Sequence, residues 1–172
     1  QNRHRESVMA DVPGLDRIQA RLTQVLVVGT TGTPVERGGR YFFRRRAADQ
    51  DLSVLVVRQG PRGRDRVLAD PHPLSADHST SMDFMDISPD GRLAAIGTRE
   101  GGADEVSVAF RDVDSGRDLP DRLGPMRFFA LVITPDLGGA YYTRCTPEGP
   151  RVHHHAMGTD PALDPVVFGT EY

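Results

Sequence analysis

The feature that most constrains this chain is a turn motif that occurs twice at a fixed spacing. Residues 85–98 read MDISPDGRLAAIGT and residues 131–144 read LVITPDLGGAYYTR. Each copy runs from an apolar stretch through Ser/Thr-Pro-Asp and Gly into a second apolar stretch. These residue types suit a tight turn, because Pro fixes φ, Asp bonds its own backbone and Gly accepts a positive φ. The step from Pro89 to Pro135 is about 46 residues, within the roughly 40–50 residues of one four-stranded β-propeller blade.

Short apolar runs after Thr30 predict an all-β fold. They are rich in Val, Phe and Tyr, and turns with Gly, Pro and Asp separate them. Together with the repeated turn they predict a partial β-propeller of four-stranded antiparallel blades, at about 31–80, 81–125 and 126–172. Closed propellers typically carry 4–8 blades, so three blades would be an incomplete ring. The expected strands are 40–44, 53–58, 66–69, 82–88, 92–98, 105–113, 128–134, 140–145, 151–157 and 165–168.

Residues 1–30 form a separate helical segment in this interpretation, with one short amphipathic helix at about 14–26. Asp11 suits the N-cap of that helix and Pro13 its first turn. Gln1 is not a natural first residue, so we expect the true N-terminus to lie upstream. The helix is predicted from apolar residues at helical spacing, namely Leu15, Ile18, Leu22 and Val25.

Composition argues against several classes of protein. The net charge is −3 with both signs interspersed, and the one basic cluster, residues 44–46, is interpreted as an exposed strand end rather than a nucleic-acid site. No long apolar run or signal peptide is visible, so no membrane partner is expected. A single cysteine, Cys145, excludes an internal disulfide and is expected to be a small buried hydrophobe. Cytoplasm and periplasm are both compatible with this usage, and we favour the cytoplasm.

Several stretches together resemble the N-terminal β-propeller of the prolyl oligopeptidase family. GGRYFFRRRAADQDLSVLVV is similar to its first strands, VLADPHPLSADHSTSM to an inter-blade loop, and VHHHAMGTDPALDPVVF to the end of its third blade. The first 25 residues resemble the helical stretch ahead of that propeller. The resemblance covers essentially the whole chain, and residues 83–121 carry its most specific part.

The resemblance implies a seven-bladed propeller that caps an α/β-hydrolase domain and gates access of short peptides cleaved after proline. The partners it implies are the remaining blades, the hydrolase domain and proline-containing peptides, with no cofactor. The family's Ser, Asp and His triad lies in the hydrolase domain, and these 172 residues contain no Gly-x-Ser-x-Gly nucleophile elbow. We therefore expect no catalytic residue and no peptidase activity in this chain. The alternative is a free-standing propeller-like binding module.

Two residues are candidates for substrate binding by resemblance. Phe128 matches a family phenylalanine that lines the apolar pocket for the residue two before proline, although the adjacent Phe129 leaves the register open by one. The other interpretation of Phe128 is a strand residue packed between blades. Asp104 resembles an acidic residue that faces the central cavity and could attract a peptide's positive N-terminus. The other interpretation of Asp104 is an exposed hairpin aspartate.

Two clusters suggest metal binding, and we expect neither to be a metal site. On a strand, His153 and His155 would share one face and His154 the other, so two ligands would still lack a third. The acidic group Asp83, Asp86 and Asp90 is spaced too widely for a calcium loop, and Asp83 and Asp86 are expected to face opposite ways. An incomplete ring also leaves blade faces uncovered, so the isolated chain is predicted to form homo-oligomers.

Overall fold

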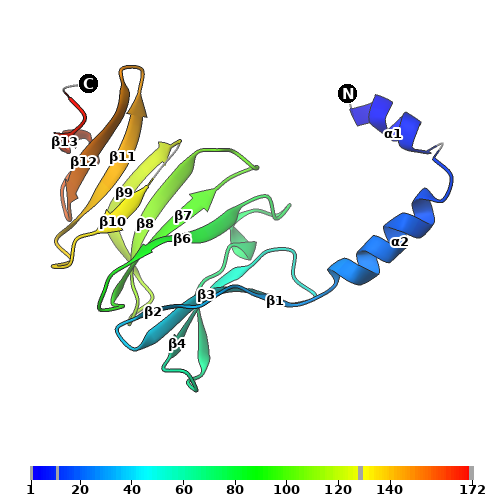
Figure 1. The fold of residues 1–172 in the computed structure, drawn as a ribbon, viewed down its shortest axis with the longest axis horizontal. Coiled ribbons are helices and arrows are strands. Elements are labelled where there is room, and N and C mark those ends of the chain that lie inside the picture. The colour runs from blue at the N-terminus through cyan, green and yellow to red at the C-terminus, as the bar shows by residue number, and fades with distance from the viewer. Residues whose placement is uncertain (1, 11, 128–129, 171–172) are drawn as a thin grey trace.

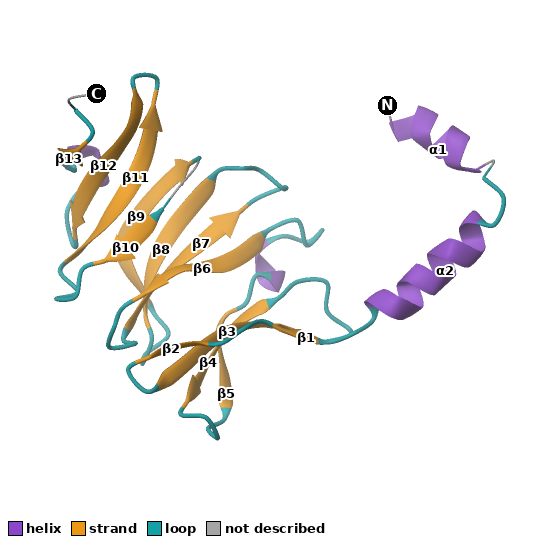
Figure 2. Cartoon of the chain, viewed as in Figure 1, coloured by secondary structure: helices purple, strands orange, loops and turns teal. Residues whose placement is uncertain are grey.

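Three antiparallel sheets lie side by side in the order of the chain, and two helices precede them (Figures 1 and 2). The computed structural model describes residues 2–10, 12–127 and 130–170. The fan of sheets confirms the all-β, partial-propeller prediction. The described helices are α1 (Asn2–Ala10) and α2 (Leu15–Leu26), and two short 3-10 helices are η1 (His72–Leu74) and η2 (Pro161–Leu163).

Each sheet is an antiparallel meander of successive strands. The first contains β1 (Thr30–Thr31), β2 (Val35–Arg37), β3 (Arg40–Arg46), β4 (Val54–Gln59) and β5 (Asp65–Ala69), with β1 and β2 both paired to β3. The second contains β6 (Ser81–Ile87), β7 (Leu93–Arg99), β8 (Val106–Asp112) and β9 (Asp118–Met126). The third contains β10 (Leu131–Ile133), β11 (Gly139–Thr146), β12 (Gly149–Ala156) and β13 (Val166–Phe168). The blade boundaries expected from sequence stay a prediction.

Two apolar cores hold the sheets together. Strand β7 shows how the middle sheet serves both, because Ala94 and Ile96 pack toward the first sheet whereas Leu93 and Ala95 pack toward the third. Successive side chains on a strand point to opposite faces, so a sheet covered on both faces needs a continuous apolar run. All four of these residues are buried accordingly.

The repeated turn has the same hydrogen bonds in both copies. Ser88 Oγ lies 2.7 Å from Asp90 Oδ1, and Thr134 Oγ1 lies 2.6 Å from Asp136 Oδ1. The hydroxyl oxygen also accepts a backbone N–H from beyond the turn, at 2.9 Å for Ser88 and 3.0 Å for Thr134. The Ser/Thr-Pro-Asp turn therefore connects the first two strands of the second sheet and of the third sheet with the same hydrogen-bond pattern.

The strand predictions after Arg40 match the observed strands within a few residues, with one omission. Strand β9 was not anticipated, although it forms the outer edge of the second sheet. It contains Pro120 and Pro125, which cannot donate a ladder hydrogen bond, and its pairing with β8 shifts register twice. Because β9 lies at the edge of the sheet, it can contain both the prolines and the register shifts. The short strands β1 and β2 were also not anticipated.

Helix α2 confirms the amphipathic prediction, and α1 is an additional helix that the pattern did not indicate. The N-cap of α2 is Gly14 and the helix begins at Leu15, so the predictions of Asp11 as the cap and of Pro13 in the first turn were wrong. Asp11 itself lies outside the described residues. The helix projects away from the sheets (Figure 1), and Ile18, Leu22 and Val25 are about half exposed. No helix among the described residues is long and apolar enough to cross a membrane.

Candidate functional site

One ion pair brings together the two regions that carry the sequence-predicted substrate residues. Glu105 ends the loop between β7 and β8, and Arg127 directly follows β9. The Arg127 Nε atom donates to Glu105 Oε1 at 2.6 Å. The loop that contains Asp104 is therefore tied to the segment that leads into Phe128.

Asp104 is exposed on this loop, next to Glu105. Phe128 and Phe129 lie outside the described residues, so their register stays a prediction. The far side of that segment is fixed at Ala130, which exchanges two hydrogen bonds of 2.9 Å with Thr143 on β11. Both described ends of the crossing from the second sheet to the third are thus anchored.

A pocket of about 380 Å³ lies beside this ion pair. Cys145 is exposed in its wall, so the expectation of a buried small hydrophobe was wrong. The reason is its place near the end of β11, where this sheet has no further sheet beside it among the described residues. The pocket is lined by Glu105, Pro125, Met126, Arg127, Arg144 and Cys145.

Charges of both signs surround the pocket. The hydrogen bond from Arg127 lowers the pKa of Glu105, and the same bond raises the pKa of Arg127, to which the charge of Asp104 adds. Both side chains are therefore charged at neutral pH. Because Arg144 also lines the pocket, the pocket offers one carboxylate to a cationic ligand group and two guanidinium groups to an anionic one.

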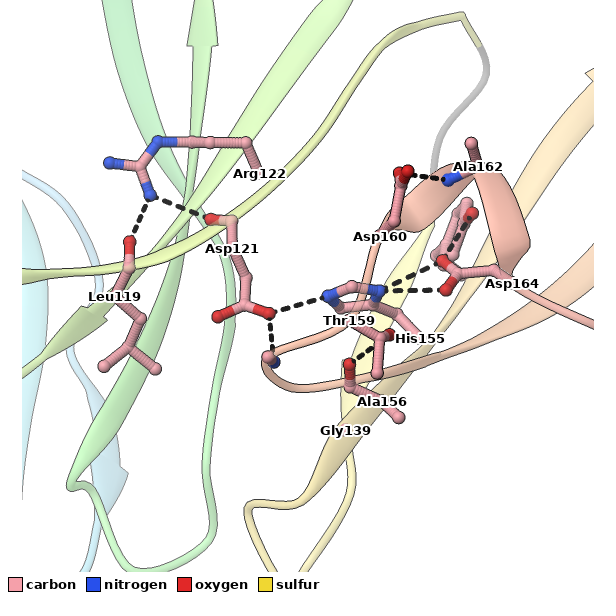
Figure 3. Close-up of polar contacts among 12 residues, drawn as sticks. Leu119, Asp121, Arg122, Gly139, His155, Ala156, Thr159, Asp160, Ala162 and Asp164 are labelled. Atoms are coloured by element: carbon pink, nitrogen blue, oxygen red, sulfur yellow. Dashed lines mark hydrogen bonds and ion pairs between the residues drawn. The ribbon is translucent and has the colours of Figure 1, made fainter.

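A buried polar network joins the second and third sheets (Figure 3). The His155 ring lies between Asp121 Oδ1, 3.1 Å from Nε2, and both carboxylate oxygens of Asp164, 3.0 and 3.1 Å from Nδ1. The Tyr142 hydroxyl donates to Asp164 Oδ2 at 3.0 Å, and the Gly158 N–H donates to Asp121 Oδ1. Strand β9, strand β12 and the segment after η2 are thus held together by buried hydrogen bonds.

Hydrogen bonds and burial shift two groups of this network. Burial acts to raise the pKa of Asp121, but the hydrogen bonds from Gly158 and His155 outweigh it and lower that pKa below its ordinary value. Burial raises the pKa of Tyr142 to about 12, and the hydrogen bond to Asp164 adds to this. Asp121 is therefore ionised and Tyr142 protonated throughout the physiological range.

This network was not predicted from the sequence. The alternation of side chains along a strand placed His153 and His155 on one face, which the pairing of β12 with β11 confirms, but no partner was predicted for either. The available signal was the burial expected on that face together with an aspartate, Asp164, that follows the strand. Asp121 lies in a strand that was not anticipated, so its contact with His155 could not be foreseen.

Two of the three histidines considered as metal ligands lie against tyrosine rings. His153 stacks on Tyr142, and His154 lies against Tyr141. Within residues 2–10, 12–127 and 130–170, no three His, Cys, Asp or Glu side chains are grouped so that they could hold a metal ion.

The side chains of the acidic cluster and of the arginine cluster form hydrogen bonds and ion pairs with other residues of the chain. Asp83 accepts from Arg44 on the first sheet at 3.1 Å, whereas Asp86 accepts from the Ile133 N–H on the third at 2.7 Å. These two aspartates face opposite ways, as expected. Arg45 pairs with Asp65, so the arginine cluster makes contacts within the protein.

The comparison with protein families settles what these sheets belong to. Residues 1–172 match the family model described as the prolyl oligopeptidase N-terminal β-propeller domain. The chain belongs to this family. It is 24% identical over 174 residues to a prolyl endopeptidase of Elizabethkingia meningoseptica, covering 95% of this chain and 24% of that protein. It is also 27% identical over 147 residues to a prolyl oligopeptidase of Omphalotus olearius, covering 73% of this chain and 19% of that protein.

Solved structures agree with this assignment. A structure from a study of two prolyl endopeptidases and their inter-domain dynamics superposes with a TM-score of 0.89 at 30% identity, over 96% of this chain and 26% of that one. Prolyl oligopeptidase B of Galerina marginata, solved with a 35-residue substrate, shares the fold with a TM-score of 0.80 at 20% identity, over 95% and 26%. The chain thus spans about a quarter of the length of these relatives.

Proposed function

We propose that this chain is the propeller segment of a prolyl-oligopeptidase-type serine peptidase and that it gates the access of short peptides to a hydrolase domain. A narrow ring above an active site admits short, flexible chains and excludes folded proteins. It also keeps water away from the acyl-transfer chemistry, which strengthens electrostatic interactions there. The family membership of the whole chain supports this proposal.

The Glu105–Arg127 ion pair is the observation that carries the proposed substrate site. It joins the loop of Asp104 to the segment that leads into Phe128, beside a pocket lined by groups of both charges. In this proposal Phe128 contacts the residue two before proline, and Asp104 attracts the positive N-terminus of the peptide. The catalytic Ser, Asp and His would come from the hydrolase domain.

The test of the apolar contact is Phe128→Ala in the full-length protein. We expect KM to rise for peptides with an apolar residue two before proline, with kcat almost unchanged, because one apolar contact contributes about 1–3 kcal/mol to binding. Phe129→Ala is the matched control. An effect at Phe129 but not at Phe128 would move the assignment by one residue, and no effect at either would remove the apolar pocket from the proposal.

The test of the charged contact is Asp104→Asn, compared on peptides with a free and an acetylated N-terminus. KM should rise for the free peptide alone, since only that peptide carries the charge that the carboxylate attracts. Asp49→Asn, at an exposed turn between β3 and β4, is the control. Equal changes for both peptides would show that Asp104 does not recognise the N-terminus.

Gating has its own measurement in the full-length protein. One proline-containing sequence is offered as a short peptide and as a loop of a stably folded protein. We expect the peptide to be cleaved and the folded protein to stay intact. Comparable cleavage of both would contradict gating.

A further inference from the structure

The buried His155 side chain has an acceptor group at each ring nitrogen. Its side chain is 0% exposed, and those of Asp121 and Asp164 are 4% and 2% exposed. An ionised carboxylate only accepts hydrogen bonds, and a neutral imidazole has only one N–H to donate. A neutral ring would therefore turn a lone pair toward one of the two carboxylates. An imidazolium donates one N–H to each of the two carboxylates.

The groups around the ring come from every element packed against it. Asp121 faces it from β9, Asp164 from the segment after η2, and Phe110 stacks on it from β8 with ring centres 6.2 Å apart. Tyr142 on β11 donates to Asp164 and is itself influenced by the positive charge of Arg144. On the same face of β12 lies His153, whose Nδ1 is 3.4 Å from the Asp164 backbone oxygen.

A protonated His155 offsets one of the two carboxylate charges that flank its ring. In the part of the chain that the structure describes, no arginine side chain makes an ion pair with Asp121 or Asp164, so His155 is their cationic partner. Removing that charge would leave two carboxylates buried beside each other without compensation. Breaking a buried ion pair by removing one partner is strongly destabilising.

We propose that His155 is a latch between the second and third sheets, whose ring donates one N–H to Asp121 on β9 and the other to Asp164 after η2. The latch acts on β9, the strand that continues into Arg127 and the crossing to β10. Loss of this contact would loosen the packing of the two sheets on either side of the pocket at Glu105. It does not depend on the peptide-binding roles proposed above.

The charge state is tested by nitrogen-15 NMR of the imidazole groups in the 172-residue chain at pH 7. The His155 signal, identified by its loss in His155→Gln, should show both nitrogens protonated. A signal from a singly protonated ring would overturn the proposal.

The latch is tested by amide hydrogen exchange. In His155→Gln, amides of β9 and β12 should exchange at least about tenfold faster relative to those of β4, because the seam between the sheets has lost its cation. His154→Gln is the matched control, since His154 is the next residue on β12 and lies against Tyr141 instead. Equal exchange in the two variants would overturn the latch.

The unchanged chain gives a second measurement if His155→Gln does not fold. Both ring N–H protons of His155, assigned through the bonds of its side chain, should exchange slowly with water, because each is buried and donates to a carboxylate. Rapid exchange of either proton would contradict the latch.

Discussion

At the residue scale, the two copies of the repeated turn share one left-handed backbone position but place different residues there. Gly91 adopts φ 68°, and Leu137 at the matching position adopts φ 60°. The left-handed conformation costs a residue with a side chain about 1–2 kcal/mol, whereas glycine adopts it freely. Leu137 also packs against the core between the second and third sheets, which offsets that cost. The same turn is therefore stabilised by glycine in one copy and by apolar packing in the other.

This difference predicts that substitutions at the two positions change the free energy of unfolding by different amounts. Gly91→Ala should lower the free energy of unfolding by at least about 1–2 kcal/mol, since the added Cβ would also lie 2.5 Å from the Arg37 carbonyl oxygen. Leu137→Gly should change it less, because relief of the backbone conformation and loss of packing act against each other. Urea unfolding of both variants measures this. A Gly91→Ala protein as stable as the parent would refute the argument.

At the scale of elements, the sequence predicted those strands and turns that depend on residues close together in the chain. Apolar runs and the Ser/Thr-Pro-Asp turns predicted most strands of the second and third sheets. They did not predict β9, because Pro120 and Pro125 argue against a strand unless its edge position is known. The Asp121–His155–Asp164 contacts could not be predicted either, since they join residues far apart in sequence that meet only when two sheets pack.

The residues of the candidate site also differ in whether the sequence could predict them. Asp104 and Phe128 came from resemblance, and no local pattern predicted the Glu105–Arg127 contact near both. That contact depends on where a hairpin loop and an edge strand end in space. The exposure of Cys145 was missed because its apolar neighbours on β11 suggested burial on both faces.

The seam between the second and third sheets predicts how stability depends on acid. Asp121 has a lowered pKa in the folded chain, so its contribution is complete above its unfolded pKa of about 3.9 and is lost as the pH falls through the lower folded value. Asp121→Asn should therefore destabilise the chain at pH 7, with a difference from the parent that shrinks below about pH 4. Thermal unfolding of both proteins across this range measures it. A difference that stays constant with pH would mean that the charge of Asp121 does not matter.

At the scale of the whole molecule, apolar surface lies uncovered on the third sheet and on the N-terminal helix α2. On the third sheet Val132 is 55% exposed and Tyr141 45% exposed. On α2 the stripe of Ile18, Leu22 and Val25 is about half exposed, and the helix lies away from the sheets (Figure 1). The helix therefore does not cover a blade face of its own chain. A propeller blade normally packs against a neighbour on each side, and here no neighbouring blade covers the outer faces.

These surfaces predict that the 172-residue chain associates with itself. Apolar surface of this extent favours burial, whereas water can satisfy the free backbone groups of edge strands, so side-chain burial is the stronger drive. We expect a symmetric dimer in which uncovered faces meet. Light scattering at high micromolar concentration should give a mass above the 18.9 kDa of one chain. Val132→Ser with Tyr141→Ser should restore the monomer if the third sheet forms the interface, and Ile18→Ser with Leu22→Ser should restore it if α2 does. A parent chain that scatters as a single 18.9 kDa species would show that these faces do not drive association.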